Sequence, residues 1–130
     1  MRPPPTGYRP PTLNGPLGRV TVASARALDD TLLAVGAVQA KVMSGYLPGI
    51  KRCYRDALKT DPTVHGALGL RFTVTDTGRT AGAQVDAPTP TLGGCVDRQV
   101  ASWRFPVPHR PDDGEAIDAA FQLELTLVPE

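Results

Sequence analysis

The sequence predicts a small α+β domain in which a three-stranded antiparallel sheet carries two helices on one face. Two segments show the apolar spacing of helices, and three segments alternate apolar with polar residues. These segments follow one another as helix, hairpin, helix and strand. Strands that keep one polar face favour an antiparallel sheet whose apolar face is covered by both helices. We therefore expect a two-layer domain over residues 18–130, preceded by a proline-rich linker over residues 1–17.

The composition fits one small globular domain with a tether. The chain has 130 residues, of which 41% are hydrophobic and 21% charged, with a formal net charge of +1. This charge argues against a general nucleic-acid binder, which needs a concentrated basic surface. No stretch approaches the length of a transmembrane helix, and prolines follow Met1 where a signal peptide would be basic and then apolar. We interpret the chain as a piece of a longer protein whose anchor or signal lies upstream.

The first helical pattern runs from about Val35 to Lys59. It is interrupted by Gly45, Pro48 and Gly49. Proline inside a helix removes a hydrogen bond and clashes with the preceding turn, so we expect a kink near Tyr46 or two abutting helices.

A hairpin and a second helix follow. Residues 68–74 and 80–87 alternate on either side of the turn signal Asp76-Thr77-Gly78. Thr89 or Thr91 can then cap a helix whose apolar stripe extends from Leu92 to Trp103.

The last strand signal is long and one-sided, and it alternates from Ile117 to Leu127. A brief alternation over residues 19–22 can add one more short strand.

The two cysteines, Cys53 and Cys95, each fall on the apolar stripe of a predicted helix. Their matching positions favour a disulfide that joins the helices and indicates an oxidising compartment. Such a bond closes a loop of about 42 residues and contributes about 4 kcal/mol on the chain-entropy model. Two reduced thiols buried as small hydrophobes are the alternative.

The residues offer little for catalysis, and we expect neither an enzyme, nor a cofactor, nor a metal. A zinc site made of Cys53, His65, Cys95 and His109 lacks the closely spaced ligand pairs that usually seed one. Trp103 and Phe105 are candidates for interface hot spots, but their places on and just after the apolar stripe favour the core.

We expect partner binding at a sheet edge, because an edge strand presents unpaired backbone groups to another chain. The predicted edge is the last strand, Ala116 to Val128, with five residues along its polar side: Asp118, Ala120, Gln122, Glu124 and Thr126. Pairing of this edge with a second copy, which gives a homodimer, is the alternative.

Five segments of the chain together form a recognisable pattern. They are Ile50-Lys-Arg-Cys-Tyr-Arg-Asp-Ala-Leu58, Asp61-Pro-Thr-Val-His-Gly66, Leu70-Arg-Phe-Thr-Val-Thr-Asp-Thr-Gly-Arg79, Cys95-Val96 and Trp103-Arg-Phe-Pro106. Over roughly residues 36–128 the chain resembles the TonB C-terminal-like fold, and more closely the AgmX/PglI C-terminal domain family of myxobacterial gliding motility. Pro48-Gly49 and the proline-rich loop after Phe105 depart from the pattern.

This resemblance implies a periplasmic domain of an inner-membrane-anchored protein, carried on a linker toward periplasmic or outer-membrane partners. It also implies work in energy transduction or gliding motility, and strand addition as the way of binding, because TonB binds a partner peptide in this way.

Overall fold

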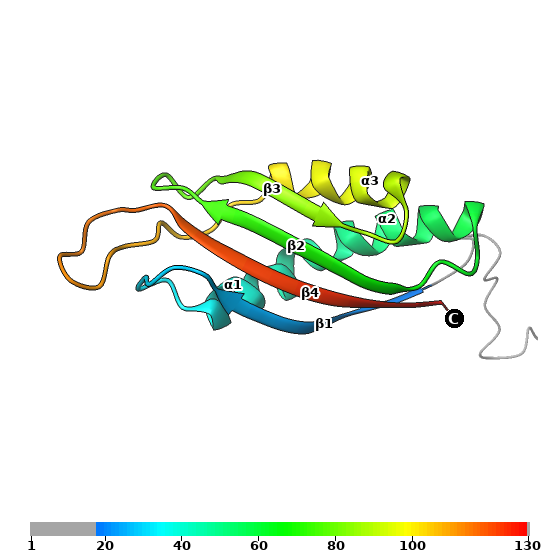
Figure 1. The fold of residues 1–130 in the computed structure, drawn as a ribbon, viewed down its shortest axis with the longest axis horizontal. Helices are drawn as coiled ribbons and strands as arrows, with labels where there is room; N and C mark the ends of the chain where they lie inside the picture. The colour runs from blue at the N-terminus through cyan, green and yellow to red at the C-terminus, as the bar shows by residue number, and fades with distance from the viewer. Residues whose placement is uncertain (1–17, 130) are drawn as a thin grey trace, which may run out of the picture.

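The computed structural model describes residues 18–129, which fold into one antiparallel sheet backed by a layer of helices (Figure 1). The sheet has the strand order β1-β4-β2-β3. The elements in chain order are β1 (Gly18–Ala27), α1 (Val35–Lys41), the π-helical turn η2 (Val42–Tyr46), α2 (Leu47–Thr60), β2 (Gly66–Val74), β3 (Thr80–Asp86), α3 (Pro90–Ala101) and β4 (Ala119–Pro129). The α+β class and the two-layer arrangement are confirmed. The predicted linker over residues 1–17 lies outside the described residues.

The sheet has four strands where the sequence predicted three. The brief alternation seen at Arg19 opens a ten-residue strand, β1, that pairs with β4 along its whole length. The register shifts between Val22 and Ser24, so Ala23 is an extra residue on β1. A bulge of this kind shifts the alternation of side chains by one residue. Residues 23–27, Ala-Ser-Ala-Arg-Ala, also contain none of the β-branched or aromatic types that indicate a strand.

The prediction that the last strand is an edge is wrong, because β4 lies between β1 and β2. It is antiparallel to both neighbours, and its backbone groups are engaged on both sides. Its alternation was read correctly, since every second residue is buried beneath the helices. These residues are Ala119, Phe121, Leu123, Leu125 and Leu127.

The first helical segment continues from α1 into α2 through the π-helical turn, and Pro48 lies in the first turn of α2. Proline is tolerated there because a first-turn N–H has no partner within the helix. The wider turn carries Tyr46, whose ring stacks on Trp103 at a centroid distance of 4.8 Å. The Tyr46 hydroxyl donates to the Arg104 carbonyl (2.7 Å) and accepts from the Arg104 N–H (2.9 Å). The interruption at Pro48 thus gives a π turn that docks on the segment after α3.

The hairpin and α3 agree with the predicted pattern. Gly78 adopts φ 83° in the turn between β2 and β3, a conformation that favours glycine. The Thr89 hydroxyl accepts the Leu92 N–H at 3.2 Å and so caps α3. Trp103 and Phe105 are buried beside Phe72, as expected of core residues.

A disulfide joins Cys53 of α2 to Cys95 of α3, as predicted. The Cys53 side chain is buried, whereas Cys95 is half-buried at the rim of the helix layer. The bond closes a loop that spans 42 residues and contains the whole β2–β3 hairpin. It therefore ties both helices and the hairpin between them into one unit.

We predict that the Cys53→Ala/Cys95→Ala variant is destabilised by about 4 kcal/mol, because the unfolded chain regains the entropy of the open loop. Urea unfolding of the variant and of the oxidised protein measures this difference. The wild-type protein unfolded in the presence of a reductant is the matched control. Its free energy of unfolding should be as low as that of the variant. Equal midpoints for oxidised and reduced protein would contradict the prediction.

A second prediction concerns Asp61, which directly follows α2. Its carboxylate accepts hydrogen bonds from the Thr63 hydroxyl (2.6 Å) and the Thr63 N–H (3.0 Å), and these bonds lower the pKa of Asp61. A carboxyl group whose pKa is lowered on folding stabilises the protein above its unfolded pKa, and that contribution is lost as the pH falls through the folded pKa.

Thr63→Val removes the hydroxyl donor, which is the largest cause of the shift, so the pKa of Asp61 should rise toward its ordinary value. An NMR titration of the side-chain carboxyl measures this change, and Asp113 in the same spectra serves as an internal control. An unchanged Asp61 titration in the variant would refute the assignment.

Candidate functional site

Two strands border the sheet, and they differ in how far their outer sides are covered. The start of β3 is partly covered, because Arg79 forms an isolated bridge with Arg104 and the Phe105 N–H donates to the Gly78 carbonyl at 2.9 Å. The Thr80 hydroxyl also donates to the Val100 carbonyl of α3 at 2.6 Å. Helix α3 runs beside β3 (Figure 1). These contacts cover only the first residues of β3, and residues 81–86 have β2 as their one strand neighbour among the described residues, so this border offers a shorter free edge than the ten residues of β1.

The outer border of β1 is longer and more open. In the part of the chain that the structure describes, β1 has only β4 as a strand neighbour. The Leu28 N–H points toward β4, since it donates to the Ala120 carbonyl at 2.8 Å. Backbone groups of successive residues in a strand point to opposite sides, so those of Ala27 and Ala25 face outward. The residues that carry these groups, Ala25 and Ala27, have small side chains, while the intervening Arg26 directs its guanidinium to Gln122 on the sheet face.

The five residues predicted to mark an edge are distributed differently. The Asp118 carboxylate, just before β4, accepts the Asp76 N–H at 2.9 Å and so joins the β2–β3 turn to the start of β4. The Ala120 N–H donates to the Asp29 carboxylate at 2.7 Å. Gln122, Glu124 and Thr126 lie on the face of β4 that the helices leave open. They are in the middle of the sheet face, and none of the five is on an edge strand.

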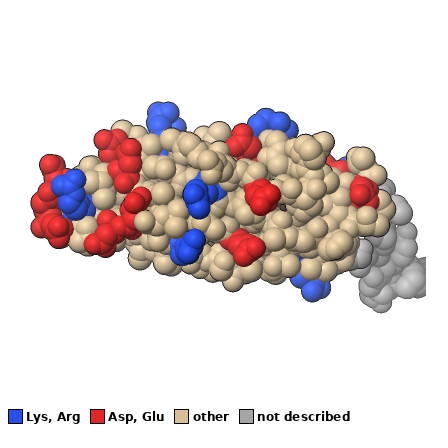
Figure 2. All heavy atoms as spheres, viewed as in Figure 1, with Lys and Arg blue, Asp and Glu red and all other residues tan. Residues whose placement is uncertain are grey.

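The helix-free face is mostly uncharged, with basic and acidic groups side by side near its middle (Figure 2). In register across the four strands stand Arg26, Gln122, Arg71 and Gln84. The next row along the strands holds Ser24, Glu124, Gly69 and Asp86. We call these the arginine row and the acidic row. Sequence reasoning missed both, because pairing across strands depends on a register and on a strand, β1, that the pattern did not reveal.

A small apolar hollow of about 260 Å³ lies between α2 and α3, beside the disulfide. Its floor includes Cys53, Leu92 and Cys95, and Asp61 and Arg98 are at its rim.

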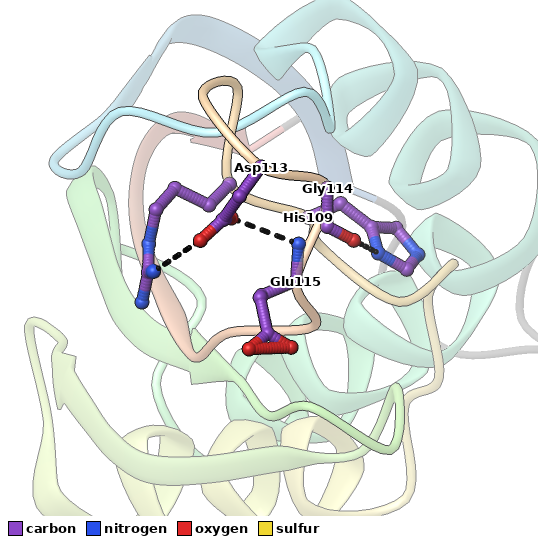
Figure 3. Close-up of polar contacts among 5 residues, drawn as sticks. His109, Asp113, Gly114 and Glu115 are labelled. Atoms are coloured by element: carbon purple, nitrogen blue, oxygen red, sulfur yellow. Dashed lines mark hydrogen bonds and ion pairs between the residues drawn. The ribbon is translucent and has the colours of Figure 1, made fainter.

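The histidines are engaged in local structure. His65 Nδ1 lies 2.8 Å from the Thr63 carbonyl. His109 Nδ1 lies 3.0 Å from the Gly114 carbonyl, within the loop before β4 (Figure 3). Since the two cysteines are bonded to each other, the four residues considered for zinc do not form a site. Residues 18–129 contain no group of three or more metal-ligating side chains.

The loop before β4 is held by its own polar contacts (Figure 3). The Asp113 carboxylate accepts the Glu115 N–H at 3.0 Å and pairs with the Arg110 guanidinium at 2.9 Å. The Glu115 hydrogen bond, followed by the charge of Arg110, lowers the pKa of Asp113. These contacts order an exposed loop without bringing catalytic groups together.

None of the helices within residues 18–129 is both long and apolar enough to cross a membrane. No family model, no curated protein and no solved structure matches this chain.

Proposed function

We propose that this domain is a non-enzymatic protein-interaction module that binds a partner chain by strand addition along the outer border of β1. The observation that carries the proposal is this ten-residue border strand with outward backbone groups at Ala25 and Ala27. An extended partner segment would gain main-chain hydrogen bonds there, and its alternate side chains would provide specificity. The sequence-based proposal is kept, but the edge moves from β4 to β1.

We further propose that the module works in the periplasm, as part of a larger inner-membrane-anchored protein with envelope partners. The disulfide supports an oxidising compartment. The two-layer fold, with helices on one face of an antiparallel sheet, is compatible with the TonB-like resemblance. A role in energy transduction or gliding motility rests on that resemblance alone.

A structural role is the alternative, in which β1 pairs with β1 of a second copy. The same outward backbone groups would serve, and a two-fold axis would relate the copies. Partner binding and self-pairing use the same border of β1. They differ only in whether a partner chain or a second copy of the domain lies against it.

Strand addition can be tested with decapeptides selected from a random display library on the immobilised domain. Binding of a selected peptide should shift the amide signals of β1, strongest at Ala25 and Ala27. Ala25→Pro removes one outward N–H at a position where an edge strand tolerates proline. This substitution should lower the affinity for the peptide roughly tenfold or more, because it removes one hydrogen bond and adds a steric block.

Ala25→Val is the matched control, because it enlarges the side chain but keeps the N–H. Its affinity for the peptide should be within a few-fold of that of the wild-type domain. An unchanged amide spectrum away from β1 shows that each variant is folded. Shifts confined to α2 and α3, or to β3, would reject the β1 edge.

The structural alternative is tested by sedimentation of the wild-type domain over a wide concentration range. A dimer that Ala25→Pro abolishes and Ala25→Val keeps would support pairing through β1. A dimer that both variants retain would exclude it.

A further inference from the structure

The helix-free sheet face carries two adjacent rows of opposite charge. The arginine row presents the cations Arg26 and Arg71, and the acidic row presents the anions Glu124 and Asp86. All four side chains are exposed. Successive rows on one face are two residues apart along each strand, which is about 6.6–6.8 Å. The face therefore changes sign from positive to negative within the span of one side chain.

The side chains of Arg26 and Arg71 share one hydrogen-bond acceptor, and this acceptor is uncharged. Arg26 and Arg71 both donate to the Gln122 Oε1 atom, at 3.4 Å and 3.2 Å. Among the described residues, the ion pairs are Lys59 with Asp56 and Arg110 with Asp113. No carboxylate of the described chain is thus within ion-pair distance of either arginine. A carboxylate from another molecule would bind these guanidinium groups more strongly than the amide oxygen does.

The acidic row is open at its centre. Gly69 of β2 stands between Glu124 on β4 and Asp86 on β3, and it has no side chain to fill the space. A hollow of about 410 Å³ spans both rows here, and its lining includes Gly69, Asp86 and Glu124 of the acidic row as well as Gln122, Arg71 and Gln84 of the arginine row. Two carboxylates on either side of a gap provide a seat for a guanidinium, which can donate to both.

The chain itself has an arginine at the position that fits this seat. A two-fold axis that lies between the rows and parallel to them places the arginine row of each copy over the acidic row of the other. Each strand then faces the same strand of the partner, so Arg71 of one copy lies above Gly69 of the second. The surface is therefore self-complementary, as an isologous contact requires.

We propose that this domain forms a face-to-face homodimer through the helix-free sheet face, with Arg71 of each copy seated over Gly69 between Glu124 and Asp86 of the other. Arg26 meets the same acidic row beside Glu124. In the neighbouring rows of β4 and β2, Ala120 pairs with Thr73 and Thr126 with Ala67, and these small side chains let the second sheet approach.

The area of the helix-free face decides whether two copies can bury enough surface for a specific dimer. Four strands about 4.8 Å apart and about nine residues long, at about 3.3 Å each, cover roughly 600 Å² on each copy. The two copies together would bury about 1,200 Å², the lower end for specific protein interfaces. Because charged groups pair across it, the dimer should weaken as the salt concentration rises.

Charge reversal tests the arrangement. The Arg26→Glu/Arg71→Glu variant has two acidic rows, and the Glu124→Lys/Asp86→Lys variant has two basic rows. Each alone should be monomeric in sedimentation equilibrium at low salt, whereas an equimolar mixture should form a heterodimer at least as tight as the wild-type dimer. Lys51→Glu/Arg52→Glu, on the exposed side of α2, makes the same change in net charge as the first variant and should still dimerise.

Gly69→Thr is a test that leaves the charges unchanged. A Cβ atom at this position would lie 3.6 Å from the Asp86 Cβ, an ordinary contact, so the fold should accept it. The threonine fills the seat of Arg71, and dimerisation should weaken roughly tenfold or more.

Three outcomes would overturn the proposal: a monomeric wild type, a mixture of the charge variants that stays monomeric, or a Gly69→Thr dimer of unchanged strength. Ala25→Pro should leave this dimer intact, since the β1 edge takes no part in it. The charge variants and Gly69→Thr therefore test the dimer through the helix-free face, whereas Ala25→Pro tests binding at the β1 edge. The two proposals can fail independently.

Discussion

The fold depends on the double pairing of β4. This strand bonds to β1 on one side and to β2 on the other, and its five inward side chains have almost no exposed surface. A strand engaged on both sides satisfies its backbone groups and buries one full face, which is the most favourable setting for an alternating segment. The helices, the hairpin and both borders of the sheet take their places relative to this strand. That arrangement leaves β1 as the longer border and the outward side chains of β4 at the centre of the free face.

The helix layer is held by two different devices. At one place the disulfide fixes α2 to α3 covalently. At another, the π turn presents Tyr46 to Trp103 and to the backbone of Arg104, which couples the start of α2 to the segment after α3. Single π turns inside α-helices are frequent at functional sites, and this one places Tyr46 against Trp103. Together these contacts hold α2 and α3 on one side of the sheet and leave the other side uncovered.

Much of the fold could be predicted because the signals were local. The alternation in β2 and β4, the glycine turn at Gly78, the Thr89 cap and the cysteine positions depend on near neighbours in the sequence. The sheet order could not be predicted in this way. The bulge at Ala23 and the absence of β-branched or aromatic residues over 23–27 left half of β1 without a strand signal, and without β1 the long strand β4 was placed at a border. The outward residues Gln122 and Glu124 were correctly assigned to a polar side, but their neighbours Arg71 and Asp86 come from distant segments that only the register brings beside them.

The pairing of β1 with β4 also affects how the chain acquires its structure during synthesis. Gly18 lies opposite Pro129, so the first described strand has no neighbour until the last one has left the ribosome. Contacts between distant segments slow folding, because a long loop must close before they form. Residues up to Ala101 can form the β2–β3 hairpin, α2 and α3 before β4 is synthesised. The apolar face beneath these helices lacks its central strand until β4 has been translated. The domain therefore completes its fold only after translation of β4, and its emerging chain exposes unpaired strand edges that a chaperone or a neighbouring nascent chain can bind.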